Sequence, residues 1–347
     1  MSLILFGENE APNVDFQYEI TRRAAMALLG SASLGLAVHG LPSYGVNLRS
    51  DELDKLLPRF SERSLALLRR LLTEPGYRGQ IGAPETARLA RNEGMNVDQL
   101  MMALIPLAQS YSLAPISNFH VGVVVRGASG CLYTGANIEI PGQCLGFAVH
   151  AEQSALSNAY MHEEESVSAL AVGGAPCGHC RQFIEEISPD GEIMILTPKA
   201  APMRLSVLLP SAFSPSALGM KHGAFPIRES GLVLANTPSD PLAVAALDAA
   251  RKSYAPYSKS QSGVAIRTSK DRIYRGSYIE NVAFNPSLSP LQIALAQMLA
   301  GGDAYSAISA VTLVEVPGSQ ISQRPVSEIV LGAIAPNVKL TVLAAGA

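Results

Sequence analysis

The sequence has few charged residues and no excess of basic ones. Of its 347 residues 16% are charged, and the formal net charge at pH 7 is −3. Proteins that bind polynucleotides gain much of their affinity by neutralising phosphates, so this composition argues against a nucleic-acid partner. The absence of tryptophan and the 6% share of aromatic residues agree, because single-stranded bases are commonly held by aromatic stacking. Small ligands are favoured instead.

Cysteine is also scarce. Four cysteines in a chain of this length are too few for a disulfide framework. Two of them form a Cys-x-x-Cys pair at Cys177 and Cys180, a spacing typical of metal or redox chemistry in a reducing compartment. We therefore expect a cytoplasmic protein.

The sequence contains no apolar run of the roughly 18 to 20 uncharged residues that a membrane span requires. No membrane partner is expected. Residues 21–40 place Arg22 and Arg23 before an Ala/Gly-rich stretch, which is similar to a twin-arginine export signal. The acidic residues before the pair and the lack of an Ala-x-Ala site after it favour a plain extension, with export as the alternative. Residues 1–50 are thus predicted to be an N-terminal extension that is signal-like or disordered.

An internal repeat decides the organisation of the remaining chain. A shift of 141 positions aligns residues 103–139 with residues 244–280 without a gap. Gly122 meets Gly263, and Gly135 meets Gly276. Because the matches fall at turns and strand ends, they indicate shared backbone geometry.

Each half predicts the same order of elements. An Ala/Leu-rich helix, near residues 98–110 and 241–252, precedes a β-β-α-β-α-β pattern, in which a hairpin is followed by crossover units that favour parallel pairing. The predicted parts are an N-terminal helical segment at 51–97, a first domain at 98–200, a linker at 201–240 and a second domain at 241–347.

Two short motifs in the first half stand at the starts of successive predicted helices. They are His150-Ala151-Glu152 and the stretch from Pro176 to Cys180. One imidazole and two thiolates make three protein ligands, which is the number typical of a catalytic zinc with an open fourth position. A helix N-terminus helps to keep a thiolate deprotonated. His179 is expected to point away from the metal.

Glu152 decides between a catalytic and a structural zinc. Two thiolates cancel the charge of Zn²⁺, so the metal alone should acidify its water less than a site of neutral imidazoles does. A nearby carboxylate that moves the proton compensates for this. Taken alone, the Cys-x-x-Cys pair also fits a redox pair or half of a structural zinc site. The combination of H-x-E and P-C-x-x-C, however, is the signature of zinc deaminases.

The chain resembles the two-domain, homodimeric cytidine deaminases of bacteria and plants over about residues 55–347. The resemblance rests on SNFHVG, GANIE, HAEQSA, PCGHCRQF, LPSAF, SYAPYSKSQSGVA and NVAFNPS. It implies an α/β fold of two repeated α-β-α domains, each with a mixed five-stranded sheet and helices on both faces. It also implies hydrolysis of cytidine or deoxycytidine to the uracil nucleoside and ammonia, in pyrimidine salvage. The implied zinc ligands are His150, Cys177 and Cys180, and Glu152 is the implied proton shuttle.

The resemblance also gives roles to residues without reactive groups of their own. Asn137 and Glu139 match the pair that holds the ribose hydroxyl, and Glu139 would repel a phosphate there, which favours nucleosides. Phe119 matches the aromatic that packs on the pyrimidine. The remaining implied substrate contacts are the backbones of Ala151 and Ala175 and an apolar wall at Phe213.

The second half lacks the groups that carry chemistry. Ser289 stands where His150 stands in the first half, Leu291 replaces Glu152, and no cysteine follows. We therefore expect a degenerate, non-catalytic domain that serves packing, and a homodimer with one zinc per chain in which two chains imitate four domains. Ala283 and Phe284 are the expected wall contributed by the partner chain.

Two other functions are alternatives to a nucleoside deaminase. One is a polynucleotide cytosine or adenine deaminase. The other is a non-catalytic nucleoside-binding protein, which the intact Glu152 disfavours.

Overall fold

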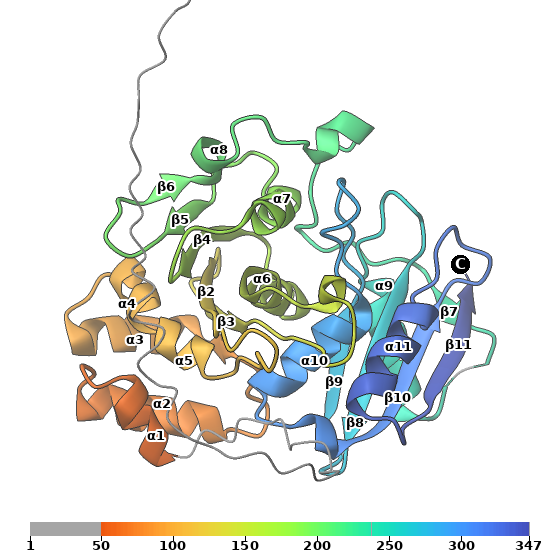
Figure 1. The fold of residues 1–347 in the computed structure, drawn as a ribbon, viewed down its shortest axis with the longest axis horizontal. Helices are drawn as coiled ribbons and strands as arrows, with labels where there is room; N and C mark the ends of the chain where they lie inside the picture. Colours follow the sequence, from red (N-terminus) through yellow and green to blue (C-terminus); the bar gives the residue numbers. More distant parts are fainter. Residues whose placement is uncertain (1–49, 237, 347) are drawn as a thin grey trace, which may run out of the picture. The chain divides into compact units, whose positions relative to one another are not determined.

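The computed structural model describes residues 50–236 and 238–346. Residues 1–49, which include the predicted export signal at Arg22 and Arg23, lie outside the described residues. Two β-sheets form, each with helices on both faces (Figure 1). The predicted α/β class and the repeat are therefore confirmed. No helix in the described part of the chain combines the length and apolar character needed to cross a membrane.

The described chain begins with five helices, which cover one face of the first sheet (Figure 1). They are α1 (Ser50–Leu56), α2 (Glu62–Thr73), α3 (Ala83–Glu93), α4 (Val97–Ala103) and α5 (Ile105–Gln109). The single helix predicted near residues 98–110 is thus two helices that meet at Leu104. Pro106 explains the break, because proline has no N–H to continue a helix but is tolerated in a first turn.

The first sheet has the strand order β1-β3-β2-β4-β5-β6. Its strands are β1 (Gln80–Ile81), β2 (Gly122–Gly127), β3 (Leu132–Ala136), β4 (Val167–Val172), β5 (Met194–Leu196) and β6 (Met203–Arg204). The β2–β3 hairpin is antiparallel, and β4 and β5 are parallel, as expected. The sheet has six strands rather than five because its four central strands gain one short strand at each edge, β1 from the N-terminal part and β6 from the predicted linker.

Helices α6 (Ala151–Met161) and α7 (Gly178–Ile187) cover the other face of this sheet. Side chains alternate along β2: Val123 and Val125 pack with the cluster on the α6 and α7 side, whereas Val124 packs with the N-terminal helices. Both faces of the strand are therefore buried. Three short helical turns, η1 (Leu145–Phe147), α8 (Leu205–Leu208) and η2 (Pro215–Leu218), lie in the connections.

The second sheet has the order β7-β11-β10-β8-β9. Its strands are β7 (Val233–Leu234), β8 (Ser262–Thr268), β9 (Ile273–Ser277), β10 (Ile308–Glu315) and β11 (Leu340–Gly346). Helix α9 (Pro241–Arg251) packs on one face, and α10 (Pro290–Ala300) and α11 (Arg324–Ile334) pack on the other. A short turn, η3 (Tyr305–Ala307), precedes β10. Apart from its edge strands, this sheet repeats the first.

The recurring glycines mark the places where a helix touches a strand. A Cβ atom on Gly135 would lie 2.1 Å from the backbone nitrogen of Ala155, and one on Gly276 would lie 2.5 Å from that of Ala294. Ala294 is the counterpart of Ala155 in the second half. Only glycine permits this close approach of β3 to α6 and of β9 to α10.

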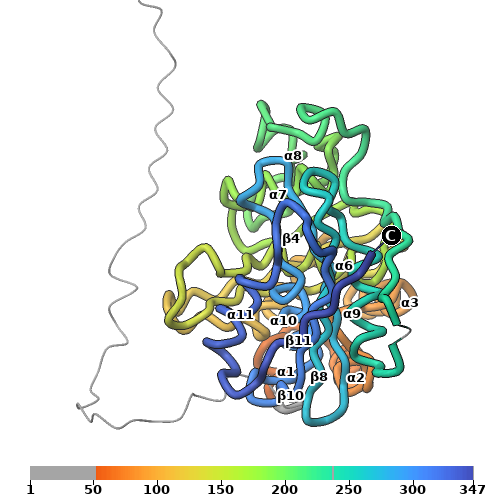
Figure 2. The backbone as a smooth tube through the Cα atoms, turned by 90° about the vertical axis from the view of Figure 1, so that its right-hand side faces the viewer, coloured from red at the N-terminus to blue at the C-terminus, as the bar shows by residue number. Residues whose placement is uncertain are grey.

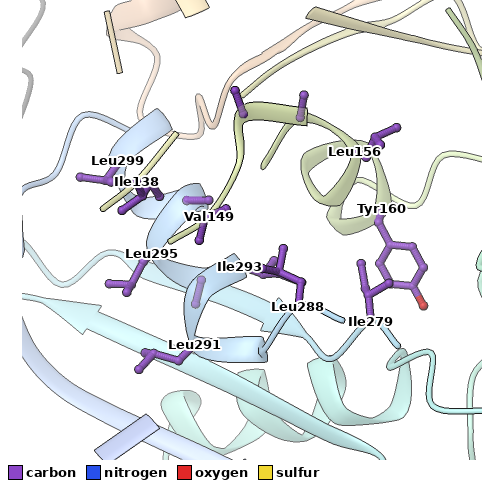
Figure 3. Packing of buried hydrophobic residues seen from close by; sticks show 14 of the residues in the cluster. Ile138, Val149, Leu156, Tyr160, Ile279, Leu288, Leu291, Ile293, Leu295 and Leu299 are labelled. Carbon is purple, nitrogen blue, oxygen red and sulfur yellow. The ribbon is translucent and has the colours of Figure 1, made fainter. Parts of the chain in front are cut away.

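The two halves meet through α6 and α10, which lie next to each other (Figure 1, Figure 2). A single hydrophobic cluster joins them, in which Tyr160 of α6 lies beside Ile279 of the second half and Ile293 of α10 lies between the two helices (Figure 3). Because both helices are almost fully buried, this joint belongs to the core of the chain.

Hydrogen bonds across the joint are reciprocal. Gln153 donates from Nε2 to the carbonyl oxygen of Pro286 at 2.9 Å, and Gln292 donates in the same way to that of Phe147 at 2.8 Å. Gln292 is the counterpart of Gln153, and Pro286 is the counterpart of Phe147. The retained glutamine therefore builds the contact between the halves, which explains why the helix recurs after its reactive groups are lost.

Candidate active site

Three potential metal ligands converge at the starts of two helices. His150 is the N-cap of α6, Cys177 is the N-cap of α7, and Cys180 lies in the first turn of α7. The Nδ1 atom of His150 lies 3.5 Å from Sγ of Cys177 and 3.3 Å from Sγ of Cys180, and the two sulfurs are 3.6 Å apart. Tetrahedral zinc geometry requires separations of about 3.6 Å for nitrogen to sulfur and about 3.8 Å for sulfur to sulfur. The donor set therefore fits a zinc ion.

The coupled protonation of the two thiols also favours the binding of a cation. The hydrogen bond from Cys180 lowers the pKa of Cys177 to about 4. The same bond, together with burial, raises the pKa of Cys180 far above its usual range. The pair thus loses one proton readily, and the second thiolate needs a bound cation to form.

Glu152 lies beside this donor set in the first turn of α6, and its side chain is buried. Burial raises the pKa of the Glu152 carboxyl, and its own backbone N–H and the Cys180 thiol oppose that shift. A carboxyl group whose pKa moves toward neutrality can both take up and return a proton.

A cavity of about 580 Å³ opens over these groups. It is lined by His150, Glu152 and Cys177, and also by the other predicted first-half contacts Phe119, Asn137, Glu139, Ala151 and Ala175. The structure thus brings together residues that the sequence separates by more than fifty positions. Size and lining suit one small polar ligand.

Sequence similarity to known proteins identifies the family of this chain. Models of the cytidine and deoxycytidylate deaminase zinc-binding region match residues 95–197 and 205–328. The cytidine deaminase of Vibrio vulnificus (strain CMCP6) is 43% identical over 255 residues, which is 74% of this chain and 86% of the relative. That of Cronobacter sakazakii is 41% identical over 280 residues, or 80% of this chain and 94% of the relative. The chain belongs to the cytidine deaminase family.

The cytidine deaminase of Vibrio atlanticus (strain LGP32) is 40% identical over 279 residues, 80% of this chain and 94% of the relative. The solved cytidine deaminase of Mycobacterium tuberculosis is 29% identical, with a TM-score of 0.31, and covers 33% of this chain and 96% of that one. The predicted enzyme class and zinc cofactor are confirmed, since the matched region is a zinc-binding one and the first half supplies a fitting donor set.

The Asn137 side chain makes three hydrogen bonds within this deaminase fold. Its Oδ1 accepts from the backbone N–H of Val121 at 2.8 Å and from the Ser112 hydroxyl at 2.6 Å, and its amide donates to the carbonyl of Phe119 at 2.9 Å. Asn137 therefore fixes the loop that carries Phe119 at the edge of the cavity.

Glu139 holds the same loop from the other side. Its carboxylate accepts from the backbone N–H groups of Ile116 at 2.7 Å and Ser117 at 3.0 Å, and from the Ser117 hydroxyl. Burial raises its pKa, but these hydrogen bonds lower it overall, so the group stays ionised. In the second half Glu280 makes the equivalent bonds to Tyr257 and Ser258, so this contact belongs to the fold of both halves.

Some predicted residues lie outside the cavity lining. The Phe213 side chain is 48% exposed, and its carbonyl accepts from Gln182 at 2.6 Å. Ala283 and Phe284 are exposed on the loop after β9. The His179 ring stacks on the His150 ring with centroids 5.0 Å apart, and His179 is not part of the group that could hold a metal ion.

Arg181 supports the site, although the sequence motifs did not indicate this. It donates to the carbonyls of Pro176 at 2.9 Å and Leu208 at 2.7 Å, and so holds the turn that leads into Cys177. Its position after the Cys-x-x-Cys pair was the only signal.

The described residues of the second half form no equivalent metal centre. Ser289 caps α10 by accepting from the N–H of Gln292 at 3.3 Å. Among residues 50–236 and 238–346, His150, Cys177 and Cys180 form the only group of three or more ligating side chains close enough to share a metal ion.

Proposed function

We propose that the chain catalyses the zinc-dependent hydrolytic deamination of cytidine and deoxycytidine to uridine and deoxyuridine, with release of ammonia, as in pyrimidine salvage. The observation that carries this proposal is the donor set with tetrahedral spacing beside the buried Glu152 in one small cavity. His150, Cys177 and Cys180 would hold the zinc. When bound, it supplies a polarised and acidified water.

Glu152 would act as the proton carrier. It accepts one proton from the attacking water and delivers it to N3 of the pyrimidine. It then takes the remaining proton of that water, from the oxygen now bonded to C4, and delivers it to the amino group at C4. The water oxygen forms a bond to C4, the C4–N bond breaks, and ammonia leaves. Burial of Glu152 keeps bulk water from exchanging these protons.

The remaining cavity residues would position the substrate. Phe119 packs on the pyrimidine, while Asn137 and Glu139 bind the ribose hydroxyl. The backbones of Ala151 and Ala175 contact the base. Because Glu139 remains ionised, it disfavours a phosphate on the sugar, which supports nucleosides over nucleotides and over polynucleotides.

We further propose that the active form is a homodimer in the cytoplasm. Phe119 is 69% exposed, and Leu145 and Phe284, which are counterparts in the two halves, are 73% and 66% exposed. Large exposed apolar side chains of this kind support a partner surface. The partner's copy of the loop with Ala283 and Phe284 would then close the cavity, and Phe213 would add an apolar wall at its rim.

The direct test is to add the purified full-length chain to cytidine and to follow the loss of cytosine absorbance and the release of ammonia. The reaction should stop after chelation and return with added zinc. Cytidine monophosphate and single-stranded DNA should not react and should not compete. Absence of turnover by the zinc-loaded chain on both cytidine and deoxycytidine would overturn the proposal.

A further inference from the structure

The helix that carries both cysteines is held at its far end by the second half. Glu186 lies in the last turn of α7 and is completely buried. Its Oε1 accepts from the hydroxyls of Tyr254 and Tyr257, each at 2.6 Å, and its Oε2 accepts from the backbone N–H of Val282 at 2.7 Å. All three donors belong to the second half.

A further bond reinforces this contact. Asn281 donates from Nδ2 to the carbonyl of Gln182, also in α7, at 2.9 Å. Helix α7 has 10 residues and is about 15 Å long, and its continuous backbone hydrogen bonds couple the direction of its two ends. The direction of its start, where Cys177 and Cys180 lie, therefore depends on what holds its end.

The contact has no counterpart on the opposite side of the joint. Buried residues in α11 repeat the spacing of those in α7, so that Ala333 stands at the position of Glu186. Leu113 and Ile116 stand at the positions of Tyr254 and Tyr257. The glutamine bonds across the joint are reciprocal, but the carboxylate and both phenols are present only on the side that holds the metal helix.

A buried carboxylate destabilises a fold unless it is fully hydrogen-bonded. An apolar side chain such as the alanine at 333 fills the equivalent place without this requirement. The α7 side therefore retains a buried carboxylate and three donors that the α11 side does without.

We propose that Glu186 is a positioning residue, through which Tyr254, Tyr257 and Val282 of the non-catalytic half set the orientation of the zinc-binding helix. The second half thereby contributes to the metal site without any ligand of its own. This inference rests on the proposed function only for its second readout, the turnover of cytidine.

The test measures zinc release from the zinc-loaded full-length chain to a chelating dye, without substrate. Tyr254→Phe/Tyr257→Phe removes both phenol donors, and Glu186→Gln keeps the side-chain volume if the double variant does not fold. The matched control is Tyr274→Phe, since Tyr274 donates to the buried Asp303 carboxylate at 3.0 Å, away from α7. Outer-shell partners typically contribute about 10- to 100-fold to metal affinity or activity. We expect release at least about tenfold faster in the double variant and within about twofold of wild type in the control.

A second readout separates positioning from general loosening. With zinc in excess, kcat for cytidine should fall in the double variant while KM stays within about twofold, because the cavity lining is untouched. Unchanged zinc release in the variants, or equal acceleration in Tyr274→Phe, would overturn the inference. If the wild-type chain does not deaminate cytidine but the release rates differ as expected, the proposed function fails and the positioning role stands.

Discussion

Replacing Gln153 by methionine removes two hydrogen bonds at once and keeps the side-chain length. Gln153 accepts from the backbone N–H of His150 at 3.2 Å and donates to the carbonyl of Pro286 at 2.9 Å. The side chain is 2% exposed, so water cannot replace either partner. Each buried group left unpaired costs about 1 to 3 kcal/mol, so the loss of both partners should lower the free energy of unfolding by about 2 to 6 kcal/mol.

Gln292→Met is the matched control. Gln292 accepts from the N–H of Ser289 at 3.3 Å and donates to the carbonyl of Phe147 at 2.8 Å, so its variant should lose about as much stability. Only Gln153 fixes the N-cap that is also a metal ligand. Gln153→Met alone should therefore lower the zinc affinity, by about 10- to 100-fold.

Chemical denaturation of the metal-stripped variants measures the stability, and competition with a chelator measures the zinc affinity. Stripping the metal first keeps ligand binding from adding to the stability. If both variants lost zinc affinity equally, the claim that Gln153, unlike Gln292, positions a metal ligand would be refuted. An unchanged free energy of unfolding in either variant would refute the claim that these glutamine hydrogen bonds stabilise the contact between the two halves.

Other predictions concern the cavity and the packing. Glu152→Gln should lower kcat by about 10² to 10⁴ with zinc content unchanged, and turnover above a tenth of wild type would exclude the proton-carrier role. Phe119→Ala should raise KM for cytidine about tenfold, since stacking on a base contributes about 1 to 3 kcal/mol, and an unchanged KM would contradict that contact. Gly135→Ala should lower the unfolding free energy by about 1 to 3 kcal/mol by forcing a Cβ onto Ala155, whereas Gly332→Ala, which meets no atom within 4 Å, should raise it by about 0.5 to 1 kcal/mol in denaturation curves.

The elements and the metal donors could be predicted because their signals are local. Apolar periodicity marked the strands, and the motif around His150 and the one ending at Cys180 each lie within a few residues of a helix start. The break between α4 and α5 at Leu104 escaped because the apolar pattern continues without interruption across Pro106 and hides the break that the proline imposes. The two-residue edge strands escaped because they are too short to have a period.

Contacts between the halves could not be predicted for a different reason. Glu186 and Tyr254 are 68 positions apart, and nothing in the sequence near either residue indicates the other. The recurrence of Gln153 as Gln292 was visible, but its purpose depends on the packing of α6 against α10. Tertiary contacts of this kind follow from the arrangement of whole domains.

The central claim is that one zinc site, in the first half, carries the chemistry. The most direct measurement is to titrate zinc into the metal-stripped chain and to record cytidine turnover together with bound zinc. Turnover should rise in proportion to bound zinc and reach its plateau at one ion per chain. A plateau that requires two ions per chain, or full turnover by the stripped chain, would contradict the account.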